Sequence, residues 1–216
     1  MPTTVTLQIS GSSDDVNQNG TSLASPSSTL WVGTYSSATS SYTGLRFNSV
    51  TIPAGATITS AQLEVFSSQT QWIGISLDLA AENIGNSPTF STGNLPSQRA
   101  LTAQTVGHSS NVQWLANTWY SLGEITDVIQ SVIDRPDWQS GNSLSIILRG
   151  TGNAWGRKFV TSWDSSPATA PRLIITFSGG GVQTLEAINS VGGPDDISTG
   201  HDDKDNMMIF LPLIMK

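Results

Sequence analysis

The sequence predicts an all-β fold, a two-sheet β-sandwich of jelly-roll type with one short helix and an extended C-terminal tail. Apolar and polar residues alternate in short segments along residues 1–177, as they do in strands with one buried face. Clusters of Gly, Pro, Asn and Ser separate these segments and mark turns. Only one segment has the 3.6-residue spacing of an amphipathic helix. About eight strands and one helix fit two packed sheets.

The composition excludes several classes of partner and site. The chain of 216 residues has a net charge of −7, so it lacks the positive charge with which proteins bind nucleic acids. It has no cysteine, which excludes disulfides and thiolate metal sites. Charged residues make up only 12%, and abundant Ser, Thr, Asn and Gln predict a polar surface of low charge. Such surfaces are common in extracellular and virion β-sandwiches, so we expect an extracellular or virion-surface location.

The start of the chain supports the same expectation. Residues 1–4 lead directly into a strand, without the basic and apolar regions of a signal peptide. A virion component, which reaches its working place without the general secretory route, fits this start. No apolar run approaches the ~20 residues that span a bilayer, so we expect no membrane span.

The first predicted strand, Thr4–Ile9, precedes a turn-rich loop over residues 11–20. This loop concentrates side-chain oxygens of the kind that bind Ca²⁺ in proteins. The alternative is that its Asx residues only form turns, since the full EF-hand spacing is absent. The candidate ligands of a structural calcium ion, the one cofactor we consider, are Asp14, Asp15, Asn17 and Asn19.

The second predicted strand, Ser28–Tyr35, carries two aromatic residues on one face. Leu30 and Val32 alternate with Trp31, so Trp31 and Tyr35 lie on the face opposite the core residues. These two rings either form a platform on which a sugar stacks or pack against a second sheet.

The stretch Tyr42–Phe66 predicts the centre of the fold. Two alternating segments, Gly44–Val50 and Thr59–Val65, flank a Pro-Gly turn over residues 52–56. We interpret the stretch as a β-hairpin or a corner. The next predicted strand is Trp72–Ala81.

The segment Glu82–Asn111 has no clear periodicity and is rich in Asn, Ser, Thr, Pro and Gly. An irregular segment of this length in a compact domain predicts a functional or interface loop. It contains Arg99 and His108, and a lone histidine in a polar loop is more often solvated than catalytic.

The second half of the domain contains the predicted helix. A strand within Val112–Tyr120 leads into Glu124–Arg135, where apolar residues recur at helical spacing and Pro136 ends the helix. The predicted closing strands are Ser143–Arg149, Arg157–Trp163 and Pro171–Phe177.

Residues 178–216 are predicted to form a separate C-terminal tail. A Gly-rich linker, 178–181, precedes an acidic segment and ten apolar-rich residues, which are too few to span a membrane. Because apolar residues need a partner, we expect the tail to dock on a neighbouring subunit or on its own sandwich. The predicted assembly anchor consists of Met207, Met208, Ile209, Phe210, Leu211, Leu213 and Ile214.

Several ordered blocks of the sequence carry a resemblance to a known family. They read GLRFNSVTIPAGATITSAQLEV, DWQSGNSLSIILRGTG, SWD and APRLIITF. With these blocks, Thr4–Phe177 resembles the DNRLRE domain, a disaggregatase-related module grouped with carbohydrate-binding modules. The resemblance implies a non-catalytic β-sandwich of secreted, cell-surface and phage proteins, with glycan binding in some members. The positions that match the family pattern, through turn glycines and Arg–Asp pairing, are Arg46, Gly141, Asn142, Gly150, Gly152, Arg157, Asp164 and Pro171.

The motifs of the chain favour a non-catalytic role. The Gly-x-Ser-x-Gly and His-Glu-x-x-His motifs are absent. Glu64, Asp78 and Glu82 are the carboxylates that glycoside chemistry could use, and surface solvation is the simpler account of them.

Two functions then compete. One is a structural or attachment protein displayed on a larger assembly, such as a phage decoration or fibre-like protein, whose partners are copies of itself or other subunits. Glycan binding accompanies this role. The alternative is a carbohydrate-binding module of a secreted or cell-surface polysaccharide-processing protein. The glycan-binding candidates are Trp31, Tyr35, Trp72 and Trp155, drawn from a wider set that includes Trp114 and Trp119.

Overall fold

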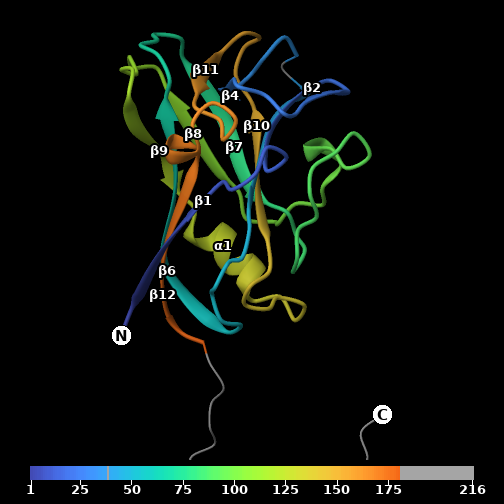
Figure 1. The fold of residues 1–216 in the computed structure, drawn as a ribbon, viewed down its shortest axis with the longest axis vertical. Helices are drawn as coiled ribbons and strands as arrows, with labels where there is room; N and C mark the ends of the chain where they lie inside the picture. The colour runs from blue at the N-terminus through green and yellow to red at the C-terminus, as the bar shows by residue number, and fades with distance from the viewer. Residues whose placement is uncertain (38, 181–216) are drawn as a thin grey trace, which may run out of the picture. The chain divides into compact units, whose positions relative to one another are not determined.

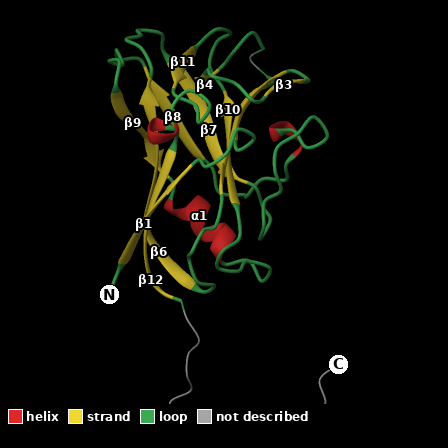
Figure 2. Cartoon of the chain, viewed as in Figure 1, coloured by secondary structure: helices red, strands yellow, loops and turns green. Residues whose placement is uncertain are grey.

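The computed structural model describes residues 1–37 and 39–180, which form an all-β sandwich. Two antiparallel sheets face each other, and a single α-helix lies near one end of the strands (Figures 1 and 2). The predicted assembly anchor, 207–214, lies outside the described residues.

The described strands form two sheets, named here sheet A and sheet B. In sheet A the order is β1-β12-β6-β11-β4, with β9 also paired to β6, and in sheet B it is β3-β2-β5-β10-β7-β8. The strands of sheet A are β1 (Thr3–Gln8), β4 (Leu30–Gly33), β6 (Ala56–Ser67), β9 (Thr118–Glu124), β11 (Arg157–Val160) and β12 (Arg172–Gly179). Those of sheet B are β2 (Asp15–Asn19), β3 (Ser22–Ala24), β5 (Ser41–Phe47), β7 (Ile75–Ala81), β8 (Val106–Ser110) and β10 (Leu144–Gly150).

The connectivity confirms the predicted jelly roll. Eight strands pair as β1-β12-β6-β9 in sheet A and β5-β10-β7-β8 in sheet B. Along the chain, consecutive strands of this set lie in opposite sheets, except for β7 and β8, which both lie in sheet B. This is the strand order of a jelly roll. The remaining strands, β2, β3, β4 and β11, are additions to this frame.

The alternating residues of the strands form the core between the sheets. In β6, for example, Ala61, Leu63 and Val65 are buried as predicted. The helix α1 (Thr126–Ile133) contacts β6 of sheet A and β7 of sheet B, so its buried apolar stripe closes one end of the sandwich (Figure 1). It is shorter than predicted, because Glu124 belongs to the end of β9.

The stretch Tyr42–Phe66 is a corner and not a hairpin. The strand β5 belongs to sheet B, whereas β6 belongs to sheet A, so the Pro-Gly turn carries the chain from one sheet to the other. Val50 and Ile52 between them are fully buried, which anchors the crossing in the core.

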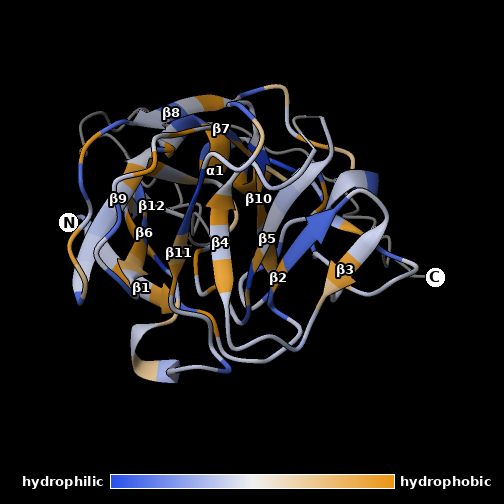
Figure 3. Ribbon diagram, turned by 90° about the horizontal axis from the view of Figure 1, so that it is seen from above, coloured by the Kyte–Doolittle hydropathy of each residue, from blue (hydrophilic) through white to orange (hydrophobic). Residues whose placement is uncertain are grey.

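Three strands lie where the sequence predicted no strand. The strand β2 has one apolar residue among five, and it appears as a hydrophilic arrow in Figure 3. This strand forms through its backbone pairing with β5 and β3, since its side chains do not alternate between apolar and polar. The other two are β3 and β8. The predicted linker also begins later than expected, because β12 continues to Gly179.

The first part of the segment Glu82–Asn111 is an ordered cover over the outer face of sheet B, and its last part contains the edge strand β8 of that sheet. Phe90 packs with Val16 and Ile147, and its ring lies so close to Gly44 that an added Cβ there would meet it at 2.6 Å. Arg99, which the sequence placed in this segment, is buried in the cover, where it pairs with Glu82. His108 lies in β8, and burial lowers its pKa.

Candidate functional site

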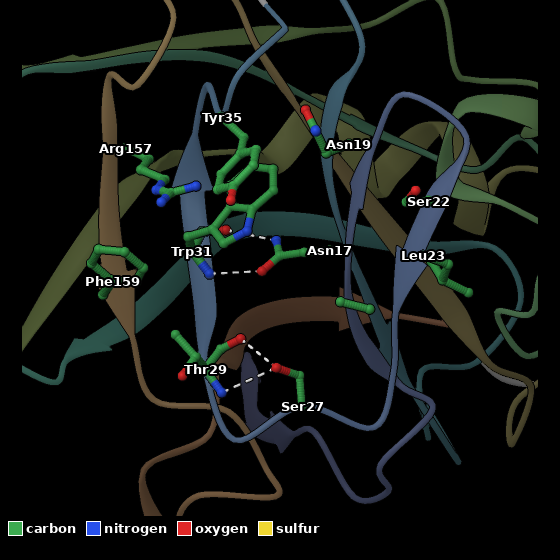
Figure 4. A pocket seen from close by; sticks show the side chains of 11 residues that line it. Asn17, Asn19, Ser22, Leu23, Ser27, Thr29, Trp31, Tyr35, Arg157 and Phe159 are labelled. Atoms are coloured by element: carbon green, nitrogen blue, oxygen red, sulfur yellow. Dashed lines mark hydrogen bonds between the residues drawn. The ribbon is translucent and has the colours of Figure 1, made fainter.

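A groove of about 410 Å³ lies where the β2–β3 hairpin of sheet B meets β4 and β11 of sheet A (Figure 4). The added strands of the jelly roll therefore form its walls. Its lining combines aromatic rings with hydroxyl and amide groups, which is the usual character of a small-molecule site. The lining residues are Asn17, Asn19, Ser22, Leu23, Ala24, Ser27, Thr29, Trp31, Tyr35, Arg157 and Phe159.

Strand pairing brings the groove residues to one face of sheet A. Because Leu30 and Val32 point into the core, Trp31 between them points to the opposite face. In the adjacent β11, Phe159 lies opposite Trp31 and Arg157 lies opposite Gly33. Residues Phe159 and Arg157 therefore share the face of Trp31.

Three aromatic rings form a row beside the groove. Trp31 and Tyr35 stack with ring centroids 5.7 Å apart and an interplanar angle of 22°. Tyr35 and Trp155 lie 4.9 Å apart with an angle of 55°. Trp31 is buried, whereas the Trp155 side chain is 55% exposed. The row thus runs from the protein interior to solvent.

Arg157 is the charged residue of the groove. Its guanidinium lies 3.7 Å from the Tyr35 ring centroid, 5.1 Å from that of Phe159 and 5.2 Å from that of Trp155. Burial lowers the pKa of Arg157, while the nearby Tyr35 opposes that shift. A guanidinium stays protonated in proteins, so the site carries a positive charge held among aromatic rings.

Asn17 joins the two sheets at the groove. Its Nδ2 donates to the Trp31 carbonyl at 2.9 Å, and its Oδ1 accepts from the Trp31 N–H at 2.9 Å (Figure 4). The Thr43 hydroxyl also donates to the Trp31 carbonyl, at 2.6 Å. The Asn17 amide thus forms the two backbone hydrogen bonds that a neighbouring strand would form with β4. These bonds position Trp31 and use both polar atoms of the Asn17 side chain.

The four calcium candidates lie in different surroundings. Asp14 binds Arg46 at 2.8 Å and Asn48 at 2.6 Å. Asn19 exchanges hydrogen bonds with a serine hydroxyl, and Asn17 binds Trp31 as described above. Within residues 1–37 and 39–180, no three His, Cys, Asp or Glu side chains are placed to share a metal ion. Calcium binding stays a prediction.

Asp15 is the most unusual carboxylate of this region. Its Oδ2 accepts a hydrogen bond from the Trp163 N–H at 2.7 Å, whereas its buried Oδ1 has no partner among the described residues. Burial raises the pKa of Asp15 to about 7, and the negative charges of Asp164 and Asp14 add to the effect. The carboxyl is therefore part protonated near neutral pH.

The structure brings together three of the four glycan candidates, namely Trp31, Tyr35 and Trp155. Trp72 is 71% exposed, but it is not among the residues of the groove. In the wider set, Trp114 is buried and stacks on Tyr120 with centroids 4.4 Å apart. Trp119 instead packs edge-on against Phe66 in sheet A.

The sequence pattern does not identify Arg157 or Phe159 as groove residues. Their alternation in β11 shows only that they share a face, and it does not show that this face adjoins β4. The three carboxylates considered for glycoside chemistry are likewise separated in the structure. Each forms its own ion pair, and these pairs are Glu64–Arg172, Asp78–Arg149 and Glu82–Arg99.

Comparison of the chain with models of protein families and with curated proteins finds no match. The resemblance to the DNRLRE domain therefore stays a prediction from the sequence. In the part of the chain that the structure describes, no helix is long and apolar enough to cross a membrane.

Proposed function

We propose that the sandwich is a non-catalytic domain that binds glycans in the groove between the β2–β3 hairpin and β4–β11. The observation that carries the proposal is the row of Trp31, Tyr35 and Trp155 beside a groove of about 410 Å³. Sugar rings have apolar C–H faces that pack on aromatic rings, and the exposed Trp155, which packs on the groove residue Tyr35, supplies such a surface.

Polar groups around the rings support the same function. The groove is lined by the amide of Asn19 and the hydroxyls of Ser22 and Thr29, all of which lie in its walls. Hydroxyl and amide groups complement the hydroxyls of a sugar, while the apolar rings complement its faces. The combination favours a carbohydrate over a purely apolar ligand.

We expect the glycan to quench or shift the tryptophan fluorescence of the protein, because Trp31 and Trp155 adjoin the groove. Replacing Trp155 with Ala should weaken binding roughly 10-fold, by loss of a stacking surface worth about 1.5 kcal/mol. The measurement is a fluorescence titration with the glycans that bind best in an array of neutral and acidic oligosaccharides.

Trp72→Ala is the matched control for this titration. It removes a tryptophan of similar exposure that, unlike Trp155, does not pack on a residue of the groove, so binding should not change. An equal loss of affinity in the two variants contradicts the assignment of the groove. Binding to none of the glycans in the array contradicts the proposed function.

The glycan-binding sandwich is further proposed to act as an attachment part of a larger assembly, such as a phage decoration or fibre-like protein. Support comes from the sequence, through its polar surface of low charge and the apolar residues 207–214. A truncation after Gly181 should abolish self-assembly while leaving a stable monomer, as measured by light scattering and thermal unfolding. A full chain that is strictly monomeric favours the alternative, a carbohydrate-binding module of a polysaccharide-processing protein.

A further inference from the structure

Arg157 differs from every other arginine of the chain. All six arginines lie in the described residues, and five of them form ion pairs with carboxylates. Arg157 forms no ion pair with any described carboxylate, and its Nη1 is buried without a hydrogen-bond partner. The paired arginines are Arg46, Arg99, Arg135, Arg149 and Arg172.

Aromatic rings surround the charge of Arg157, but its buried Nη1 has no hydrogen-bond acceptor among the described residues. Tyr35, Phe159 and Trp155 surround the guanidinium at 3.7 to 5.2 Å from their ring centroids. Aromatic faces attract a cation, yet they do not replace the oxygen acceptors that five N–H groups require. A partly buried donor without an acceptor costs free energy, and a ligand that supplies the acceptor recovers this cost.

The position of Arg157 makes these donors available to a ligand. Its side chain lines the groove together with Tyr35 and Phe159 (Figure 4). Among the described residues that line the groove, Arg157 is the one charged group. An anion in the groove would therefore meet this cation, and no carboxylate is among the residues that line the groove.

We propose that the groove selects negatively charged glycans and that Arg157 binds the anionic group. The inference rests on the proposed glycan-binding function and names its ligand class. A guanidinium forms two parallel hydrogen bonds with a carboxylate, and it binds the oxygens of a sulfate in a similar way. The aromatic row then packs on the sugar ring that carries the anion.

Two pairs of matched probes test this inference and distinguish the source of the negative charge. The first pair is a uronic acid oligosaccharide and the same oligosaccharide with its carboxyl groups reduced to alcohols. The second pair is a sulfated galactan oligosaccharide and its desulfated form. We expect one charged probe to bind at least 10-fold more tightly than its neutral counterpart, by isothermal titration calorimetry. Its affinity should fall as the salt concentration rises.

Variants of Arg157 locate the effect. Arg157→Gln should weaken binding of the charged probe roughly 10- to 100-fold and reduce the difference between the charged and neutral probes. Arg157→Lys, which keeps the charge but loses the two-pronged geometry, should keep part of that difference. Arg149→Gln removes an equal charge from an exposed ion pair with Asp78, so it should leave binding unchanged.

The outcomes separate this inference from the proposed function. If the neutral probes bind tightly and neither Arg157→Gln nor Arg157→Lys changes their affinity, the inference is wrong. The proposed glycan-binding groove is then retained. An equal loss in Arg157→Gln and Arg149→Gln also overturns the inference, because the effect is then one of net charge. Binding to no glycan in the array contradicts the proposed function and the inference together. Thermal unfolding of each variant verifies that it is folded.

Discussion

Replacing Arg99 with Met should lower the free energy of unfolding by about 3–5 kcal/mol. The Arg99 side chain is 1% exposed and pairs with the buried Glu82 carboxylate. Its Nη2 also donates to the Pro88 carbonyl at 2.9 Å, and its guanidinium lies 4.5 Å from the Phe90 ring centroid. The variant would leave Glu82 buried without its cation and would detach the cover from sheet B.

Urea denaturation followed by tryptophan fluorescence measures this loss. Arg149→Met is the control, because its ion pair with Asp78 is exposed and should contribute less than about 1 kcal/mol. Adding Glu82→Gln to Arg99→Met should recover part of the stability, since no buried charge is then left unpaired. A loss in Arg99→Met no larger than that in Arg149→Met would show that the buried pair does not hold the cover.

Replacing Asp15 with Asn should stabilise the protein by about 4 kcal/mol above pH 7 and have little effect below pH 4. The folded carboxyl keeps its proton up to a pKa of about 7, whereas the unfolded one loses it near the ordinary value of 3.8. The free energy of unfolding is therefore highest, with respect to Asp15, below about pH 4, where the carboxyl is protonated in both states. It falls as the pH rises towards 7, and it changes little above that pH.

The amide keeps the one hydrogen bond of Asp15, because its Oδ1 can accept from the Trp163 N–H as Asp15 Oδ2 does. Its Nδ2 replaces the oxygen that has no partner among the described residues. The protonated carboxyl also carries a donor there, so the amide and the neutral acid share this cost. Unfolding free energies of the wild type and the variant between pH 4 and 8 measure the effect. Asp127→Asn, the same charge change at an exposed helix position, should show no such pH-dependent gain. A constant difference between Asp15→Asn and the wild type across this range would contradict the shifted pKa.

Strands with alternating apolar and polar residues could be predicted, because burial of one face of a strand requires an apolar residue at every second position. In β6 and β12 the apolar residues recur every second position, and both strands lie where the sequence placed them. The polar strand β2 has no such pattern. It forms because β5 and β3 provide hydrogen-bond partners on either side, a property of the neighbouring strands.

The candidate site was predicted in part for the same reason. Trp31 lies in β4 between the core residues Leu30 and Val32, so alternation predicts that it faces away from the core, whereas Tyr35 lies beyond the end of this strand. The placement of Arg157 beside them depends on the pairing of β11 with β4, which joins residues more than 100 positions apart. The engagement of Asn17 with the Trp31 backbone likewise depends on the approach of the two sheets.

The linear pattern alone predicts an all-β sandwich with one amphipathic helix, and it leaves open whether Trp31 and Tyr35 are exposed or buried. Hydrophobic periodicity and turn residues determine local structure over a few positions, so both can be identified in the sequence. The packing of distant segments decides that Tyr42–Phe66 is a corner, that Arg99 is buried, and that Arg157 lies among three aromatic rings. These features depend on contacts between distant segments, because the partner of a buried or charged side chain is chosen by the packing of the sheets.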